Sequence, residues 1–299
     1  MDKGIDRRDF LKLIGIGGAL IVMDTGRLAG AADNKMAQDT LSFIQLSDTH
    51  WGFNDPKINP DFAGTLRKAI AQINSMKSQP DFIIFSGDVT HTTDDPKERR
   101  RRMGEAREII GGLRLKNVKM MPGEHDAGLD NGEAFQEYFG TTHYTFQQKD
   151  VNFIVVDNAS DSTSSIGDTQ LQWLSAEMEK LDKDSRIVVF THRPLFELYP
   201  QWDWWTRDGA KAIDILMPYK NVVVFYGHIH QEHHHMTGHI AHHAARGMLF
   251  PLPAPGSVPK RVQIPWDNDQ PYKGVGYRSA VPKKDAYGYD LTEFPIIKV

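Results

Sequence analysis

The sequence predicts an α/β protein, built as a four-layer α-β-β-α sandwich of two mixed β-sheets with a metal site at the carboxyl ends of strands. Three observations support this prediction. Short runs that are apolar throughout alternate with segments of helical periodicity, which is typical of strands buried on both faces. Strings of Asp, Glu and His follow several of these runs. At 299 residues, the chain is also long enough to bury a large core within one domain.

Strands and helices alternate in the first part of the chain. Apolar strands are predicted at 41–46, 81–85 and 118–121. Apolar residues recur at helical spacing over 60–76, and a charged helix is expected over 94–110, where two glycines would end it. Because each strand is apolar along its whole length, we expect a parallel sheet with helices outside it.

The pattern changes in the second part. A two-residue Lys-Asp connection between apolar runs indicates an antiparallel hairpin, so the sheets are expected to be mixed. Residues 255–299 are rich in Pro, Gly and Tyr and show little periodicity, which favours an irregular extension packed on the domain. The other expected elements are a hairpin at 144–148 and 151–157, a helix at 169–181, strands at 186–190 and 222–226, and a second hairpin within 233–254.

Five polar strings follow the predicted strands in one order along the chain. They combine Asp, Glu and His, whose side chains bind divalent metals of intermediate hardness. The chain contains no cysteine, so a metal site must use nitrogen and oxygen ligands. The strings are Asp48-Thr49-His50, Gly87-Asp88, Gly123-Glu124-His125-Asp126, Thr191-His192 and Gly227-His228-Ile229-His230.

Together, the strings resemble the pattern of the calcineurin-like metallophosphoesterase superfamily, which includes purple acid phosphatases and cyclic-nucleotide phosphodiesterases. The resemblance implies two metal ions, which activate water and neutralise phosphoryl oxygens. It implies Asp88 as the ligand shared by both ions. Asp48, His50 and His230 would complete the first site, and Glu124, His192 and His228 the second.

The resemblance gives His125 a different role. Its position in the family contacts the substrate and donates a proton to the leaving group, and Asp126 would orient the ring. The alternative is a structural His–Asp pair outside the metal sites.

Glu124 departs from the family motif, which has Asn at this place. With Asp48 and Asp88 it brings the carboxylate charge to −3, so two divalent ions would leave about +1, whereas an Asn site would leave about +2. One hypothesis is that Glu124 selects a mixed pair such as Fe(III) with a divalent ion. The other is a degenerate site that binds metal without turnover. The ligand types admit Fe, Mn or Zn.

Four further residues are candidates for substrate binding: Arg193, Trp202, Trp204 and His235. Arg193 follows a predicted ligand and could contact phosphate or form a salt bridge. The tryptophans lie in a long loop, where they either stack on a flat ligand or hold the loop in place. His235 belongs to a segment in which eight of the thirteen histidines cluster, between 228 and 243. That segment is either a solvated hairpin or an auxiliary metal site, for which His235 and His239 would be the first pair to test.

The first 31 residues resemble a twin-arginine export signal. An Arg7-Arg8 pair precedes Phe-Leu-Lys, an apolar stretch too short to span a bilayer follows, and Ala29-Gly30-Ala31 offers a cleavage site. An amphipathic helix with a chance arginine pair is the alternative. We therefore expect a signal peptide at 1–31, a linker at 32–40, a catalytic domain at 41–254 and the extension at 255–299. The twin-arginine export machinery would be a partner, the periplasm the destination, and no stable membrane anchor is expected.

The predicted function is an exported binuclear phosphoesterase that hydrolyses a small phosphomonoester or phosphodiester. The formal charge of −4 is not that of a protein that binds nucleic-acid polymers, so none is expected as a partner. The alternatives are a cyclic-nucleotide or nucleotide phosphodiesterase, a Ser/Thr protein phosphatase, and a metal-binding protein that has lost turnover.

Overall fold

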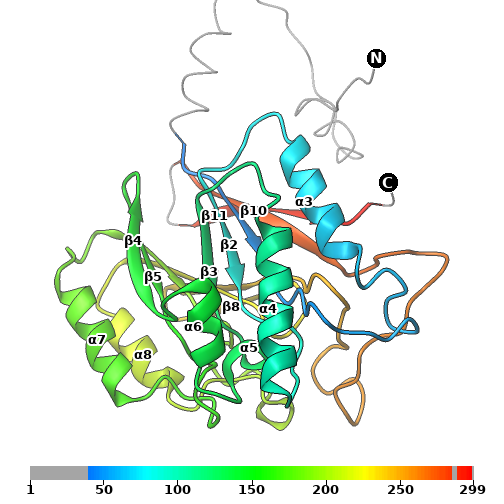
Figure 1. The fold of residues 1–299 in the computed structure, drawn as a ribbon. Helices are drawn as coiled ribbons and strands as arrows, with labels where there is room; N and C mark the ends of the chain where they lie inside the picture. The colour runs from blue at the N-terminus through cyan, green and yellow to red at the C-terminus, as the bar shows by residue number, and fades with distance from the viewer. Residues whose placement is uncertain (1–39, 285–287, 298–299) are drawn as a thin grey trace, which may run out of the picture.

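The computed structural model describes residues 40–284 and 288–297, which form two β-sheets packed between helices (Figure 1). One sheet has the strand order β11-β10-β1-β2-β3 and the other β4-β5-β6-β7-β9-β8. The strands are β1 (Phe43–Leu46), β2 (Phe82–Ser86), β3 (Val118–Met121), β4 (Tyr144–Gln148), β5 (Val151–Val155), β6 (Arg186–Phe190), β7 (Asn221–Tyr226), β8 (His233–Thr237), β9 (Ile240–Ala244), β10 (Gly276–Pro282) and β11 (Tyr289–Pro295). The helices are α3 (Thr65–Ser75), α4 (Pro96–Ile110), α5 (Glu124–Ala127), α6 (Glu133–Phe139), α7 (Asp168–Glu179) and α8 (Gly209–Leu216), with a 3₁₀ turn η1 (Pro200–Trp202).

Aromatic rings fill the space between the two sheets. Phe43 on β1 stacks on Phe82 of β2, with ring centroids 5.0 Å apart. From the other sheet, Phe153, Phe190 and Phe225 meet the Phe43 ring edge-on. All five side chains are buried, so this aromatic layer joins the sheets.

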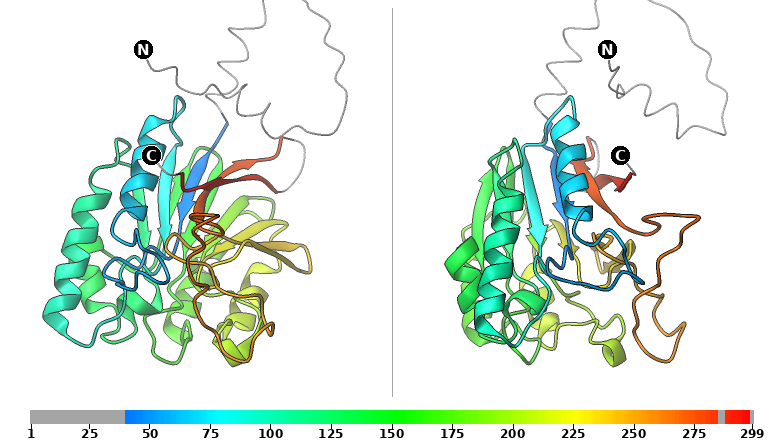
Figure 2. Two further views of the ribbon diagram at one scale, coloured as in Figure 1. Left: turned by 90° about the vertical axis from the view of Figure 1, so that its right-hand side faces the viewer. Right: turned by 45° about the vertical axis from the view of Figure 1, so that its right-hand side comes forward.

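Helices cover the outer face of each sheet. Ile83 and Phe85 of β2 point away from the aromatic layer and join the core cluster that contains buried residues of α3 and α4. On the other sheet, Ile187 and Val189 of β6 join a cluster with buried residues of α7 and α8. The central strands β2 and β6 are therefore apolar on both faces, and the predicted four-layer architecture is confirmed (Figure 2).

Parallel pairing places the functional strings at one end of the sandwich. β1, β2 and β3 run parallel to one another, as do β5, β6, β7 and β9. The loops that leave β1, β2, β3, β6 and β7 carry the predicted ligands. Because the carboxyl ends of parallel strands lie at the same sheet edge, these loops are brought together.

The prediction that 255–299 is irregular is wrong for its second half. β10 pairs antiparallel with β1, with Phe43 opposite Ala280, and β11 pairs antiparallel with β10. These strands contain polar residues and prolines and form one edge of their sheet, so they lack the continuous apolar pattern of a central strand. Residues 1–39, which include the predicted leader and most of the linker, lie outside the described residues. No helix among the described residues is long and apolar enough to cross a membrane.

The histidine-rich hairpin is shorter than predicted, because only 233–237 and 240–244 pair. Its cross-strand neighbours are His234 with His243 and His235 with His242. The pairing of His235 with His239 is therefore not supported: the His235 ring stacks on Phe196 at 3.8 Å, and His239 Nε2 donates to the Tyr219 carbonyl.

His242 is fully buried, and neither ring nitrogen has a hydrogen-bond partner among the described residues. Burial, together with His235 and His243, lowers the pKa of His242 to about 3. Its ring is therefore neutral in the folded protein, whereas the unfolded chain takes up a proton below about pH 6.5. Protonation of the unfolded chain therefore lowers the free energy of unfolding progressively as the pH falls from about 6.5 toward 3, whereas above pH 6.5 His242 causes no such loss.

We expect acid destabilisation that a single substitution reduces. When the pH is lowered from 8 to 5, the free energy of unfolding falls by about 2 kcal/mol for one histidine that folding keeps neutral. His242→Leu should remove this contribution, while His143→Asn, which changes a half-buried histidine elsewhere, should not. Urea unfolding at both pH values measures the difference. An unchanged pH dependence in His242→Leu would contradict the assignment.

Candidate metal centre

The loops at the strand ends carry strained backbone. Five of the seven predicted metal ligands have φ values between 43° and 66°, the left-handed region that side chains other than glycine rarely adopt. Such conformations cost free energy and persist where the surrounding structure holds them. These five residues are Asp48, His50, Asp88, His228 and His230.

Two glycines let these loops approach one another closely. A Cβ at Gly87 would lie 2.2 Å from Nδ1 of His192, and one at Gly123 would lie 2.1 Å from Oδ1 of Asp88. Neither position has room for a side chain. The glycines of the second and third strings are therefore required by packing around the ligands.

Asp48, His50 and His230 form the first group of ligand atoms. His230 Nε2 lies 3.3 Å from Asp48 Oδ1 and 3.1 Å from His50 Nε2. The other nitrogen of His230, Nδ1, donates to the Phe250 carbonyl at 2.7 Å. This bond places the proton on Nδ1 and leaves the Nε2 lone pair directed into the group.

Glu124, His192 and His228 form the second group together with Asp88. Glu124 lies between the two rings, with Oε2 3.0 Å from His192 Nε2 and Oε1 2.9 Å from His228 Nδ1. Backbone carbonyls fix both rings: His192 Nδ1 donates to Ser86 at 2.8 Å, and His228 Nε2 donates to Asp203 at 2.9 Å. The sequence predicted the membership of both groups.

Asp88 lies between the two groups. Its Oδ2 is 3.4 Å from His192 Nε2 in the second group and 3.7 Å from His50 Nε2 in the first. The other oxygen, Oδ1, accepts the backbone N–H of His125 at 2.9 Å. The carboxylate thus faces both groups, as a ligand shared by two ions would.

The donor set fits metal cations. Glu124 Oε2, His192 Nε2 and His228 Nδ1 are buried and make no hydrogen bond within the part of the chain that the structure describes. Burial alone would raise the pKa of Glu124, but Arg193, His228 and His192 hold it well below its usual range. Burial lowers the pKa of His50 well below its usual range, so this ring has a free lone pair. Burial alone would lower the pKa of His192, but Asp88 and Glu124 raise it well above its usual range, so in the metal-free protein these carboxylates attract a proton that a metal cation would replace.

His125 lies beside the two groups, and Thr92 rather than Asp126 contacts its ring. His125 is the first-turn residue of α5 whose half-buried ring lies near Asp88, with Nε2 4.0 Å from Asp88 Oδ2. Its Nδ1 bonds the Thr92 hydroxyl at 2.7 Å and accepts the Thr92 backbone N–H at 3.3 Å. Because a backbone N–H can only donate, the proton of the neutral ring lies on Nε2.

The prediction that Asp126 orients His125 is wrong. The Asp126 carboxylate is buried and accepts the backbone N–H groups of Val89, Thr90 and Gly123, at 2.9, 2.7 and 3.0 Å. It therefore ties the loop after β2 to the loop after β3. The sequence places Asp126 beside His125, but on a helical turn adjacent side chains point in different directions.

Arg193 is buried and paired on two sides. Its guanidinium lies 3.6 Å from Glu124 Oε2 and forms an ion pair with Asp203. It also lines a pocket of about 190 Å³ that opens beside Glu124. The other lining residues include Thr92, Asp161, Ser162 and Ser164, so the pocket is polar.

Trp202, Trp204 and His235 are not among the residues that line this pocket. Trp202 and Trp204 are buried in a cluster with Tyr226 and Phe250, and their rings meet edge-on at 5.1 Å. The structure favours the reading in which they hold the loop in place. For His235, the stacking on Phe196 gives a structural role.

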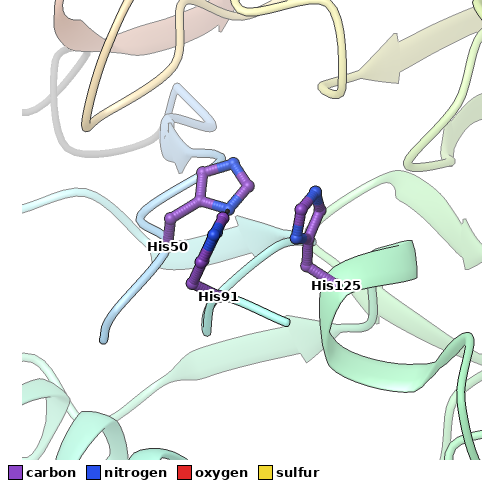
Figure 3. A group of neighbouring side chains, drawn as sticks. All are labelled: His50, His91 and His125. Carbon is purple, nitrogen blue, oxygen red and sulfur yellow. Dashed lines mark hydrogen bonds between the residues drawn. The ribbon is translucent and has the colours of Figure 1, made fainter. Parts of the chain in front are cut away.

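His91 is a site residue that sequence reasoning missed. It follows β2 three residues after Asp88 and forms a third group of histidines with His50 and His125 (Figure 3). Burial, followed by His125, lowers the pKa of His91 to about 4. The sequence signal that could have found His91 was its position only three residues after Asp88. A residue that close to a predicted ligand in the same loop lies near the site.

Comparisons with known proteins agree with this geometry. Residues 41–232 match the calcineurin-like phosphoesterase family. A probable cyclic nucleotide phosphodiesterase of Rhodopseudomonas palustris is 24% identical over 239 residues, which cover 73% of this chain and 84% of that protein. A probable glycerophosphodiester phosphodiesterase of Arcobacter nitrofigilis is also 24% identical, covering 63% of this chain and 71% of its own. The human Ser/Thr-protein phosphatase CPPED1 is 23% identical over 55% of this chain and 58% of its own.

Two solved structures show the same fold. A dimetal phosphatase from Danio rerio superposes with a TM-score of 0.57 at 13% identity, covering 87% of this chain and all of that one. A purple acid phosphatase from yellow lupin gives a TM-score of 0.59 at 13% identity, covering 85% of this chain and 51% of that one. The family match extends over well more than half of the chain and includes every strand end that carries a ligand. This protein therefore belongs to the calcineurin-like phosphoesterase family, whose members are metallophosphoesterases.

Proposed function

We propose that this protein is a binuclear metal-dependent phosphoesterase that acts on a small phosphodiester. The position of Asp88 between two groups of ligands carries the proposal, because one carboxylate that faces both groups is the arrangement that two neighbouring ions need. The relatives named as phosphodiesterases support a diester over a monoester.

Two bound metal ions would supply the Lewis acidity that activates water and neutralises the phosphoryl oxygens. Asp48, His50 and His230 would hold one, and Glu124, His192 and His228 the other, with Asp88 shared. His125 holds a proton at Nε2 near this centre, where it can be donated to the oxygen of the departing alcohol. Thr92 keeps the proton at that nitrogen by bonding Nδ1.

The pocket beside Glu124 supports a small substrate. At about 190 Å³, it accommodates a short alcohol group of an ester but not a folded protein surface. No aromatic ring lines it, although Ser162, Ser164 and Thr92 offer hydroxyls. A polar alcohol is therefore the better fit, and a nucleotide would have to place its base elsewhere.

Arg193 bears on the choice of metal. Asp48, Asp88 and Glu124 carry −3, and the buried guanidinium 3.6 Å from Glu124 returns one positive charge. Asp203 pairs with the same guanidinium, so Arg193 offsets only part of the Glu124 charge, and two divalent ions leave between about +1 and +2, against about +2 for an Asn-containing site. We therefore favour a pair of divalent ions, such as Mn or Zn, over a mixed pair with Fe(III).

The proposed enzyme is exported from the cytoplasm. The twin-arginine-like string at residues 6–12 and the small residues at 29–31 support a periplasmic location, with the twin-arginine export machinery as the partner. Fusion of residues 1–40 to a folded reporter, with and without Arg7→Lys and Arg8→Lys, tests this part on its own.

Turnover of model esters tests the proposed function. Protein loaded with Mn, Fe or Zn should hydrolyse bis(p-nitrophenyl) phosphate faster than p-nitrophenyl phosphate. Asp88→Asn should lose activity by about two orders of magnitude or more, because both ions lose a ligand. Metal analysis accompanies the assay. Bound metal without turnover on the esters, on cyclic nucleotides or on a phosphoserine peptide would instead indicate a degenerate site.

Another prediction concerns Thr92. Thr92→Val should reduce kcat about 10-fold, part of the roughly 10²–10⁴-fold that a general acid contributes, and Thr92→Ser should retain activity. The loss should be larger for an alkyl ester than for a p-nitrophenyl ester, because nitrophenolate leaves without a proton. Equal losses on both esters would exclude an effect through His125.

A further prediction concerns the Glu124–Arg193 pair. Arg193→Gln removes one of the positive groups that compensate Glu124, so KM for an anionic ester should rise about 10-fold, or about 1.4 kcal/mol. The double variant Glu124→Asn, Arg193→Gln should recover most of this loss while still binding two divalent ions. Activity of the wild-type protein only when Fe(III) is present would contradict the charge argument.

A further inference from the structure

His50 is oriented differently from the other three predicted histidine ligands. In His192, His228 and His230, the second ring nitrogen donates a hydrogen bond to a backbone carbonyl. The second ring nitrogen of His50 faces a side chain instead of a backbone carbonyl: His50 Nδ1 lies 3.4 Å from Nδ1 of His91 (Figure 3). One ligand therefore depends on a residue that can be changed without altering the backbone.

His91 is itself held on several sides. Its backbone N–H donates to the Trp51 carbonyl at 2.9 Å, and its own carbonyl accepts a hydrogen bond from Arg102 Nη1 at 2.8 Å. The Phe53 ring meets the His91 ring edge-on, with centroids 5.2 Å apart. These contacts fix the ring without using the nitrogen that faces His50.

His91 also touches the ring of His125. The two rings stack with centroids 4.9 Å apart and an angle of 21° between their planes, and the His50 ring meets His125 edge-on at 4.7 Å. The ring that faces a predicted metal ligand on one side thus supports the predicted proton donor on the other.

We propose that His91 is a positioning residue that holds His50 for the first metal ion through an Nδ1–Nδ1 hydrogen bond and holds the His125 ring by stacking. The proposal rests on the proposed function, since it takes His50 as a metal ligand. In this arrangement His50 Nδ1–H donates to His91 Nδ1, and the His91 proton lies on Nε2. The His50 Nε2 lone pair is then directed toward Asp88 and His230, from which it is 3.7 and 3.1 Å away.

A third ion bound by His50, His91 and His125 is the competing explanation. Each ring offers one nitrogen within 4.8 Å of the others. This group has no carboxylate, however, and His50 cannot give Nε2 to the first site and Nδ1 to a further ion while it remains a neutral imidazole. We therefore assign the contact as a hydrogen bond.

Two substitutions separate the two contacts of His91. His91→Asn keeps an acceptor near the place of Nδ1 but removes the ring, whereas His91→Phe keeps the ring but removes the acceptor. His91→Phe should weaken binding of the first ion by about 10–100-fold, the usual effect of losing a partner that orients a ligand. His91→Asn should retain that affinity but reduce kcat, with a larger loss on alkyl than on p-nitrophenyl esters.

Metal affinity is measured in two backgrounds by competition with a chelator. In His192→Ala, which removes a ligand of the second site, His91→Phe should weaken binding of the remaining ion. In His50→Ala, which removes the first-site ligand itself, His91→Phe should have no further effect. Thermal unfolding of each metal-free variant controls for loss of fold.

The results distinguish a failure of the His91 assignment from a failure of the proposed function. An unchanged first-site affinity in His91→Phe, or an equal loss in both backgrounds, would overturn the assignment of His91 while leaving the proposed function intact. A third ion in the wild-type protein that is lost in His91→Phe would establish the competing site instead. Wild-type protein that binds no metal would contradict the proposed function, and this inference with it.

Discussion

The convergence of three carboxylates, two of them fully buried, is the constraint on which the rest of the structure depends. Asp48, Asp88 and Glu124 come from three strand ends and lie within reach of the same few imidazole nitrogens. Without compensation, such a group would repel itself and would pay a large desolvation cost. Arg193 and the histidines compensate in part, and the two proposed cations would complete the neutralisation. The features that bring these groups together therefore serve binding rather than the stability of the metal-free chain.

The scaffold explains how strained loops can persist at this place. Five predicted ligands have left-handed backbone, and the glycines at 87 and 123 leave no room for a Cβ against other predicted ligands. The aromatic layer between the sheets and the helical clusters outside them fix the strand ends from which these loops leave. Strain of this kind needs a rigid support, which two packed sheets provide better than loops alone.

The sequence was informative where a local pattern reflects a physical requirement. Buried central strands must be apolar on both faces, so β1, β2, β6 and β7 could be recognised, and the ligands followed because they directly succeed those strands. β10 and β11 mix polar residues and prolines with apolar ones, and β11 is an edge strand, so neither shows this pattern and both were missed. Contacts between loops left little local signal. Thr92 bonds His125 from a loop more than thirty residues away, and the spacing of His91 from Asp88 does not show that its ring lies against both His50 and His125.

The same distinction explains the error at Asp126. Adjacent positions suggested a His–Asp pair, yet the carboxylate binds three backbone N–H groups of two loops and the neighbouring ring turns to a threonine. Burial and the nearby Asp88 charge raise the pKa of Asp126 to about 6, so a carboxylate turned toward His125 and away from its three backbone N–H donors would be less stable still. A neutral hydroxyl can fix the ring without repulsion from Asp88 and leaves the proton at the nitrogen that faces the centre. The charge of the metal site thus restricts which groups can orient the residues around it, and Thr92 and His91 are both neutral partners of this kind.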